Sequence, residues 1–423
     1  MPIIGIDDTD SKTEMCTTYL TIEILKNSNL DLIGFPKLVR LNPNIPLKTR
    51  GNAAISLTLG RGEGKGTLVG RIGKEEVRSF KKYREEKLDI DVMTLIERFS
   101  PKDKDTNPAL LTTSEKNSEG FYWDAVSEFV DYKKIIERVK GEFSSINGQI
   151  GIVGANAAVS WPGVNPTYEL IAYLDRDKWS GEHFVDDSSS MYIESSLPDT
   201  FDSFDFRNKY NAIRPTTKTP VLFGIRGTDP TRLIQYENYV KSEPYSSYIV
   251  YETNQGTDDH LIERSIGETR LYNSAIIRGF VTSGPVWERG GVLCFSIEMN
   301  KEEIKAVALE PTKEFRTLLS KLRKGDEVRV YGGITRVGFI NVEKIQVVSL
   351  SKITEIRPPL CHECKTRMES VGRSGGFRCR KCGARSRTGE VRVEEREIAP
   401  GYYEVPIIAR RHLARPIKLG IIK

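Results

Sequence analysis

The chain has 423 residues, of which 38% are hydrophobic and 29% charged, and its formal net charge is +5. A typical domain holds ~100–200 residues, so we expect several domains. No stretch approaches the roughly 18 apolar residues of a membrane-spanning helix. The N-terminus also lacks the basic and apolar segments of a signal peptide. These properties argue against a membrane protein and predict a cytoplasmic one.

The charge is unevenly distributed. From Cys361 to Lys423 the chain carries 15 Lys and Arg against 7 Asp and Glu, whereas the first 360 residues carry 48 against 51. A basic end on a near-neutral body predicts a polyanionic partner, and the cysteine spacing in this end favours nucleic acid over a membrane. The alternative is a solubilising tail.

Residues 1–130 predict a mixed α/β domain. Strand-like runs are "PIIGI", "LVRL" and "NAAISLTLG", and helical periodicity covers 14–26 and "KEEVRSFKKYREEK" (74–87). The next 140 or so residues contain helical spacing over 123–143, strand-like "GQIGIVGANAAVSW" (148–161) and "TYELIAYL" (167–174), and a β-α-β pattern over 221–253. Two strand–helix–strand units predict a ferredoxin-like domain over 131–270.

The pattern changes near Leu271 to short alternating strands separated by glycine turns. Such a pattern predicts a small β-barrel over 271–352. The phrase "KGDEVRVYGGI" (324–334) resembles a strand of OB-folds, whose groove binds unpaired bases. The alternative is a β-domain that has no ligand.

Four of the six cysteines form the pattern "CHEC…CRKC", with fourteen residues between the two pairs. Each C-x2-C pair aims two thiolates at one ion, and the spacer brings the second pair opposite the first. The pattern predicts a structural zinc ribbon, with an Fe–S cluster as the alternative. The predicted ligands are Cys361, Cys364, Cys379 and Cys382.

The first strand-like run, "MPIIGIDDTDS", ends at three carboxylates: Asp7, Asp8 and Asp10. Such a cluster needs a cation, and Mg²⁺ that carries the phosphates of ATP is the usual one. Ser11, Lys12, Thr13 and Glu14 match a capping box, which predicts a helix that starts near Lys12 and points its N–H groups at the same phosphates. Thr18 would lie two turns along this helix, ready to meet a phosphoryl group. The alternative is ordinary turn and capping chemistry.

Two known phosphate-binding motifs do not match. "GRGEGKGT" (60–67) lacks the Walker pattern because Leu59 and Gly66 stand where Gly and Ser or Thr are required, although Lys65 remains a candidate phosphate ligand. "DTDSK" differs from the motif of aspartyl-phosphate phosphotransferases at Lys12.

Five features in fixed order are "GIDDTDS…CTTYL", "KTRGNAA" (48–54), "FGIRGTD" (223–229), the OB-like block and the cysteine ribbon. Together they resemble the archaeal isoleucine-tRNA 2-agmatinylcytidine synthetases along nearly the whole chain. The resemblance implies four domains. They are a kinase-like ATP-binding domain (1–130), a ferredoxin-like domain (131–270), an OB-fold (271–352) and a zinc ribbon with a basic C-terminal segment (353–423).

The resemblance also implies a reaction. Such enzymes use ATP to phosphorylate the C2 oxygen of the wobble cytidine of an isoleucine tRNA, and the amine of agmatine then displaces phosphate, so that the anticodon reads AUA. By resemblance, Asp7, Asp8 and Asp10 bind metal and phosphate, and Thr18 becomes phosphorylated. The nucleotide would be held by Ser11, Lys12, Arg50, Gly51, Asn52 and Lys65.

Agmatine is a small dication, so we expect carboxylates and an apolar wall around it. The candidates are Asp205, Arg226 and Asp229, with Phe204 or Phe206 as wall, although Asp229 before Pro230 also suits a helix cap. Two other functions compete with the ligase. They are a tRNA- or single-strand-binding protein without catalysis, and a small-molecule kinase with a nucleic-acid-binding appendage. The carboxylate cluster together with Thr18 favours an enzyme over a binding protein.

Overall fold

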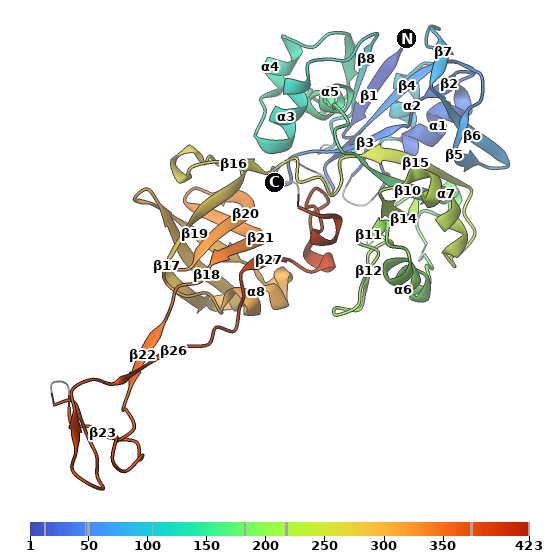
Figure 1. Cartoon of the computed structure of the whole chain (residues 1–423). Coiled ribbons are helices and arrows are strands. Elements are labelled where there is room, and N and C mark those ends of the chain that lie inside the picture. The colour runs from blue at the N-terminus through green and yellow to red at the C-terminus, as the bar shows by residue number, and fades with distance from the viewer. Residues whose placement is uncertain are drawn as a thin grey trace.

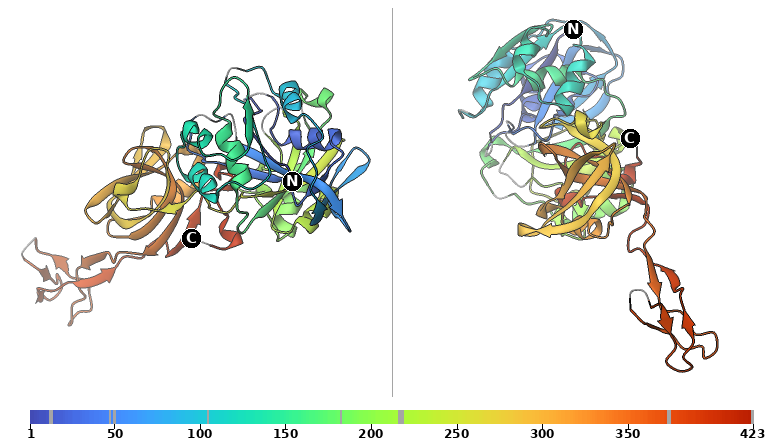
Figure 2. Two further views of the ribbon diagram at one scale, coloured as in Figure 1. Left: turned by 90° about the horizontal axis from the view of Figure 1, so that it is seen from above. Right: turned by 90° about the vertical axis from the view of Figure 1, so that its left-hand side faces the viewer.

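The structure, a computed structural model, describes residues 1–11, 14–46, 48, 51–103, 105–181, 183–215, 219–372 and 375–421. Figure 1 shows three parts: a body built from the chain up to strand β15 (Ser247–Thr253), a β-barrel beside it, and a narrow arm that ends in the cysteine ribbon. The two views of Figure 2 also show the arm projecting away from the rest. Among the described residues, no helix has the length and apolarity needed to cross a bilayer.

A single mixed sheet runs through the body and joins the two regions that the sequence predicts as separate domains. Its strands are β1 (Ile3–Asp7), β2 (Asp31–Ile33), β3 (Lys37–Arg40), β4 (Ala53–Glu63), β5 (Thr67–Ile72), β6 (Glu75–Phe80), β7 (Lys82–Arg84), β8 (Ala109–Thr113), β9 (Glu142–Ser145), β10 (Thr167–Tyr173), β11 (Thr200–Phe201), β14 (Val221–Gly227) and β15 (Ser247–Thr253). The order is β11-β14-β10-β15-β5-β6-β2-β4-β1-β8-β9, and β3 pairs with both β15 and β4.

Helices cover both faces of this sheet. They are α1 (Tyr19–Asn27), α2 (Val92–Phe99), α3 (Glu119–Ser127), α4 (Tyr132–Ile136), α5 (Ile152–Ser160), α6 (Asp187–Ser196) and α7 (Pro230–Tyr236), with a small hairpin of β12 (Phe204–Asp205) and β13 (Tyr210–Asn211). Side chains alternate across β1, so Ile4 and Ile6 join the core that includes α1 and α2, whereas Ile3 joins the core that includes α5. At Gly5 a Cβ would lie 2.2 Å from the carbonyl oxygen of Ala155, so glycine permits the close packing of α5 on β1.

Four local predictions differ from the structure. The helix predicted from Lys12 begins at Tyr19, because Ser11 and Glu14 close a turn and Met15 has a positive φ of 64°. The segment 74–87 forms β6 and β7, whose charged side chains are largely exposed. The strand-like run 148–161 forms the buried helix α5, because its small residues fit against β1. The helix predicted over 123–143 is divided into α3, α4 and strand β9. The β-α-β pattern of β14, α7 and β15 is confirmed.

The predicted β-barrel is confirmed and closed. Its elements are β17 (Ser274–Glu288), β18 (Val292–Met299), β19 (Glu302–Ala308), α8 (Glu314–Leu319), β20 (Glu327–Arg336) and β21 (Phe339–Ser349). Two short strands pair with it from outside the closed circle: β16 (Ile262–Glu263) with β17, and β27 (Gly401–Glu404) with β21. Strand β17 pairs with both β18 and β20, which closes the circle, and β19 runs parallel to β21. The interior is filled by aliphatic side chains and Phe295.

The arm leaves the barrel on two paired strands, β22 (Thr354–Arg357) and β26 (Glu390–Val393). Beyond them lies a three-stranded ribbon of β23 (Glu369–Ser370), β24 (Phe377–Arg378) and β25 (Arg385–Ser386). After β26 the chain returns, forms β27 on the barrel, and ends between the barrel and the body (Figure 1). We call residues 405–419 the strap.

Candidate functional site

A cavity of about 210 Å³ lies where the first strand ends. Asp7, Asp8 and Asp10 line it together with Lys48 and Asn52. Much of the remaining lining is apolar, although Glu128 and Asp131 add two further carboxylates. The apolar residues are Leu41, Ile45, Phe129, Val130, Ile150 and Val153. A cavity that combines apolar lining with carboxylates and a lysine suits a nucleotide with its metal-bound phosphates.

The backbone around the carboxylates is specialised. Asp8 has a φ of +56°, an uncommon conformation for a residue with a side chain, and its Oδ2 accepts a hydrogen bond from the backbone N–H of Asn107 at 2.9 Å. Asp7 lies against helix α5, where a Cβ at Gly154 would come within 1.8 Å of the Asp7 Oδ2. The chain therefore holds the carboxylates at the strand end at the expense of local strain.

The carboxylates repel one another. Burial, followed by the neighbouring charge of Asp8, raises the pKa of Asp7 well above its usual range. Burial, reinforced by Asp10, raises the pKa of Asp8 to about 6. Because both groups favour a proton when nothing else neutralises them, they would gain from a bound cation.

The donor set fits Mg²⁺, which prefers carboxylate oxygens and keeps several waters and phosphate ligands of its own. In the described parts of the chain, no three of these carboxylate oxygens lie within 4.8 Å of one another. The residues therefore suit an ion held partly by a nucleotide rather than a closed protein cage.

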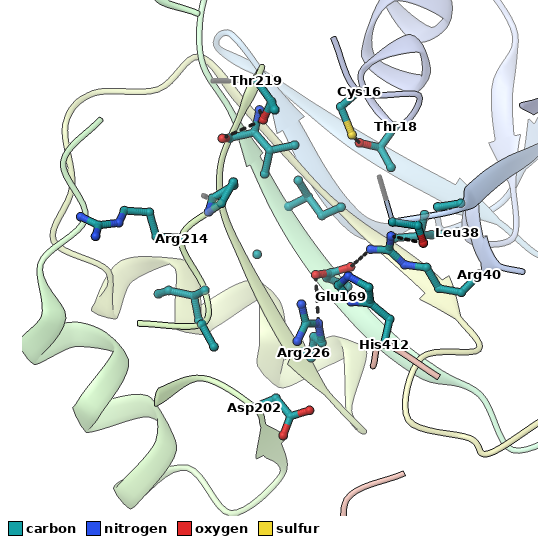
Figure 3. A pocket seen from close by; sticks show the side chains of 18 of the residues that line it. Cys16, Thr18, Leu38, Arg40, Glu169, Asp202, Arg214, Thr219, Arg226 and His412 are labelled. Carbon is teal, nitrogen blue, oxygen red and sulfur yellow. Dashed lines mark hydrogen bonds and ion pairs between the residues drawn. The ribbon is translucent and has the colours of Figure 1, made fainter. Parts of the chain in front are cut away.

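A second cavity, of about 340 Å³, adjoins the first, and Asp10, Asn52 and Ala53 line both. Figure 3 shows Thr18 and Cys16 on one side of this second cavity and Arg40, Glu169, Arg226 and His412 across from them. Thr18 is the N-cap residue of α1, yet its side chain makes no capping hydrogen bond. Its Oγ1 lies 3.1 Å from the Sγ of Cys16 instead.

Two tyrosines from the other half of the sheet support the Thr18 backbone. The hydroxyl of Tyr251 donates to the Thr18 carbonyl oxygen at 2.8 Å, and the Tyr173 and Tyr251 hydroxyls lie 2.9 Å apart. Both tyrosines are fully buried. The start of α1 is therefore anchored to β10 and β15.

The second cavity is rich in arginine. Glu169 lies on its floor, 3.3 Å from the Arg226 Nε and 3.9 Å from the Arg40 Nη2. Among the described lining residues, five arginines outnumber three carboxylates. The arginines are Arg40, Arg214, Arg226, Arg410 and Arg411, and the carboxylates are Asp10, Glu169 and Asp202. Guanidinium groups in such number suit phosphate oxygens.

The structure places two of the six predicted nucleotide residues at the cavities. Gly51 lines the second cavity and Asn52 lines both, while Ser11 lies in the turn before helix α1 and lines neither cavity. Lys12 and Arg50 lie outside the described residues. Lys65 is exposed in the turn between β4 and β5 and lines neither cavity.

The three residues predicted to bind agmatine lie at different places in the structure. Arg226 lines the second cavity. Asp229 caps helix α7 by accepting from the N–H groups of Thr231 and Arg232, and it lines neither cavity. Asp205 is buried and accepts a hydrogen bond from the backbone N–H of Ile408 in the strap. Phe204 is a buried residue, and Phe206 is half exposed.

Sequence reasoning missed Lys48 and His412, and for Arg410 and Arg411 in the strap it left open whether they touch RNA or pack on the body. Lys48 stands within the quoted motif "KTRGNAA" and could have been found there. No signal in the sequence marks the strap, because its approach to the cavity depends on how the chain returns from the arm.

The four cysteines of the ribbon converge as predicted. Their sulfur atoms all lie within 4.8 Å of one another, and the Sγ atoms of Cys361 and Cys382 are 3.5 Å apart. A tetrahedral zinc site places its sulfurs ~3.8 Å apart. The residues therefore fit Zn²⁺ as a structural ion. Exposed basic side chains surround them: Arg378, Arg380, Lys381, Arg385 and Arg387.

Replacing Cys379 by Ser should reduce bound zinc from about one ion per chain to a small fraction, since three thiolates cannot complete the site. The body and barrel should melt as in the unchanged protein, because only β22 and β26 connect the ribbon to them. Zinc content by atomic emission and thermal melting measure the two effects. Cys294→Ser, in the barrel, is the matched control and should keep its zinc. Full zinc content in Cys379→Ser would contradict the assignment.

Three family models match the chain. They are described as the TiaS TCKD domain (residues 3–147), the TiaS FLD domain (149–260) and the TiaS C-terminal zinc ribbon domain (358–398). A protein of Thermoplasma volcanium, named as the isoleucine-tRNA 2-agmatinylcytidine synthetase TiaS, is 39% identical and covers 98% of this chain and 97% of its own. The protein of the same name from Archaeoglobus fulgidus is 37% identical, and the match covers 98% of this chain and 96% of that protein.

Solved structures agree. The crystal structure of apo TiaS, an isoleucine-tRNA agmatidine synthetase, superposes with a TM-score of 0.84 at 35% identity and covers 99% of this chain and 97% of its own. A complex of TiaS with its isoleucine tRNA, AMPCPP and agmatine superposes with a TM-score of 0.80 at 33% identity. The match covers 98% of this chain and 96% of that chain. The chain therefore belongs to the family of isoleucine-tRNA 2-agmatinylcytidine synthetases (TiaS).

Proposed function

We propose that this protein uses ATP to join agmatine to C2 of the wobble cytidine of an isoleucine tRNA, by way of a phosphorylated cytidine. Relatives of similar length carry this name, and a solved relative is in complex with its isoleucine tRNA, an ATP analogue and agmatine. The observation that carries the proposal is the junction of the two cavities at Asp10, Asn52 and Ala53. A phosphoryl group bound in the acidic cavity can pass there to an acceptor in the arginine-rich cavity.

The chain's own residues serve this transfer by position and charge. Lys48 and the backbone beside Asn52 hold phosphate oxygens, and Asp7, Asp8 and Asp10 hold Mg²⁺, which supplies charge neutralisation when bound. Arg40 and Arg226 face the acceptor cavity and stabilise negative charge on the phosphorylated base. Thr18 presents its hydroxyl from the opposite wall, where a phosphoryl group can be transferred to it.

The arginine excess changes our expectation for agmatine. A cavity with five guanidinium groups opposes the entry of a dication, and phosphate bound there reduces this repulsion. Glu169 and Asp202 are the candidate partners of the agmatine guanidinium, which would have to displace the arginines now paired with them. Asp205 and Asp229 stay predictions that the geometry does not favour.

The finer fold assignments belong to the same proposal. Helix α8 between β19 and β20, together with the parallel β19–β21 pair, supports an OB-fold. A kinase-like first domain and a ferredoxin-like second domain stay proposals, as do the limits 1–130, 131–270, 271–352 and 353–423. Strand β9 pairs with β8, and the first family model matches residues 3–147. Both observations support a first domain that ends after residue 130, near residue 147. The cytoplasm, where tRNA is found, is the proposed location.

Incubation with ATP, Mg²⁺, agmatine and an isoleucine tRNA transcript tests the proposal. Nucleoside mass analysis should show agmatinylated cytidine only when all four are present, and Thr18→Ala should yield at least about tenfold less product. Thr94→Ala, on the exposed face of α2, is the matched control. Unmodified tRNA after incubation with the intact protein would reject the proposal. ATP consumption that phosphorylates a small molecule while the tRNA stays unchanged would instead favour a kinase.

The ribbon has a role in the same proposal. Its exposed basic side chains lie far from the cavities, at the end of the arm, where they can reach a distant part of the tRNA (Figure 2). Cys379→Ser should therefore weaken tRNA binding at least about tenfold, because the phosphate contacts of the ribbon are lost. Filter binding measures this effect, and unchanged affinity in a zinc-free protein would count against it.

A further inference from the structure

The strap is fixed on both sides of His412. The backbone N–H of Gly256 donates to the His412 carbonyl oxygen at 2.8 Å, and the N–H of Asp258 donates to that of Leu413 at 2.9 Å. Leu413 is buried in a core that includes Tyr122 and Trp161. On the other side, Arg411 donates to the Asn44 Oδ1 at 2.6 Å. The strap is therefore an ordered wall of the arginine-rich cavity.

The imidazole of His412 is open to that cavity. Figure 3 shows it beside Glu169, between Arg40 and Arg226, and its Nε2 would lie 3.7 Å from a Cβ built on Gly51. Within the described part of the chain, its ring nitrogens make no hydrogen bond. Two other histidines differ, since His260 pairs with Glu343 at 2.7 Å and His183 with Glu243 at 3.2 Å.

The charged groups around the His412 ring determine its pKa. Enclosure within the cavity, followed by the cations Arg40 on β3, Arg226 on β14 and Lys48, holds the pKa of His412 well below its ordinary value, although the side chain keeps contact with solvent in the cavity. Glu169 on β10 is occupied by Arg226 and by the Gln255 Nε2 at 2.5 Å. The ring is therefore neutral before substrate binds and able to accept a proton.

We propose that His412 is the catalytic base of the second half-reaction, the attack of agmatine on the phosphorylated cytidine. This inference rests on the proposed function. The amine releases its first proton to solvent and enters as the neutral group. Its nitrogen then forms a bond to C2 and passes its second proton to the imidazole. The C2–O bond breaks, and phosphate leaves with the electron pair.

The charges around His412 determine when its ring can accept the proton. A phosphorylated oxygen against Arg40 and Arg226 compensates their charge, which restores basicity to the ring when the leaving group is in place. The carboxylates of the cavity are poorer bases, because Glu169 is paired with Arg226 and Asp202 with Arg410. His412 is thus the lining group best placed to take the proton.

The test separates the two half-reactions in single-turnover experiments with the full chain. In His412→Asn, transfer of labelled terminal phosphate from ATP to tRNA without agmatine should stay within about twofold of the unchanged protein. Conjugation of agmatine should slow by about 10²-fold, the lower end of the effect of a general base. The Michaelis constant for agmatine should change little. The residual rate should rise with pH as more amine becomes neutral.

Chemical rescue distinguishes a base from a structural residue. In His412→Ala, added imidazole should restore conjugation in proportion to its neutral form, since the truncated side chain leaves room for it in the cavity. His183→Asn is the matched control and should conjugate at the original rate. Equal loss of both half-reactions, or loss without rescue in a variant of unchanged melting temperature, would overturn the proposal. Absence of product with the unchanged protein would instead reject the proposed function.

Discussion

Asp8→Asn should slow product formation by about 10²–10³-fold, because phosphoryl transfer depends on charge placed at the phosphates. Asn tolerates the positive φ at this position, and its carbonyl oxygen can still accept from the Asn107 N–H, so the backbone should keep its shape. Single-turnover formation of modified nucleoside measures the effect. Asp103→Asn, on the exposed loop nearby, is the matched control and should react at the original rate. An unchanged rate in Asp8→Asn would remove the carboxylate cluster from the mechanism.

The same variant should gain stability when no ligand is bound. The pKa of Asp8 is raised to about 6 in the folded protein. At pH 7 the carboxylate is therefore ionised in both states, and its charge is less favourable in the folded protein than in the unfolded chain. Removing that charge should stabilise the ligand-free protein by about 1–2 kcal/mol, a value reduced for the opening of the side chain to the cavity. The gain should shrink as the pH falls below about 6 and vanish only when the pH lies well below 3.8, where the carboxyl is protonated in both states. Chemical unfolding at pH 7.5 and pH 4.5 measures it, and an equal difference at both would contradict the reasoning.

Gly154→Ala should destabilise the protein, although Gly→Ala inside a helix usually stabilises by up to about 1 kcal/mol. The new methyl group would lie 1.8 Å from the Asp7 Oδ2 and 2.8 Å from Leu41, so either α5 or the carboxylate must move. We expect a loss of about 1–3 kcal/mol in the free energy of unfolding and at least tenfold weaker ATP binding. Denaturant unfolding and calorimetry measure the two quantities.

Gly120→Ala is the matched control, also in a helix of the first part of the chain. Its nearest neighbour would be the Ser118 Oγ at 3.5 Å, an ordinary contact. This variant should therefore be as stable as the unchanged protein or slightly more stable. A destabilisation equal to that of Gly154→Ala would show that the contact with Asp7 is not the cause.

Features that depend on local chemistry could be predicted from the sequence. The cysteine pairs form their site because two short turns aim the thiolates, and neither needs a distant partner. The barrel strands are rich in β-branched residues, so they are readable as strands. The carboxylates of Asp7, Asp8 and Asp10 follow the first strand directly and therefore come to line one cavity.

Features that depend on tertiary packing could not be predicted. The run 148–161 is apolar enough for a buried strand, but its Gly and Ala residues are selected by the close approach of α5 to β1. The capping box at Ser11 is satisfied within a single turn and leads to no helix. His412 stands just over 400 residues beyond the first strand and reaches the cavity only because the chain returns from the arm.

The shared sheet limits how the enzyme can respond to its substrates. Strand β15 of the second half pairs directly with β3 and β5 of the first, so a hinge between the halves would have to break main-chain hydrogen bonds. Clamshell closure is therefore unavailable to the two cavities. The strands that carry cavity residues therefore keep their places, and a nucleotide must flip out of its stack to reach them.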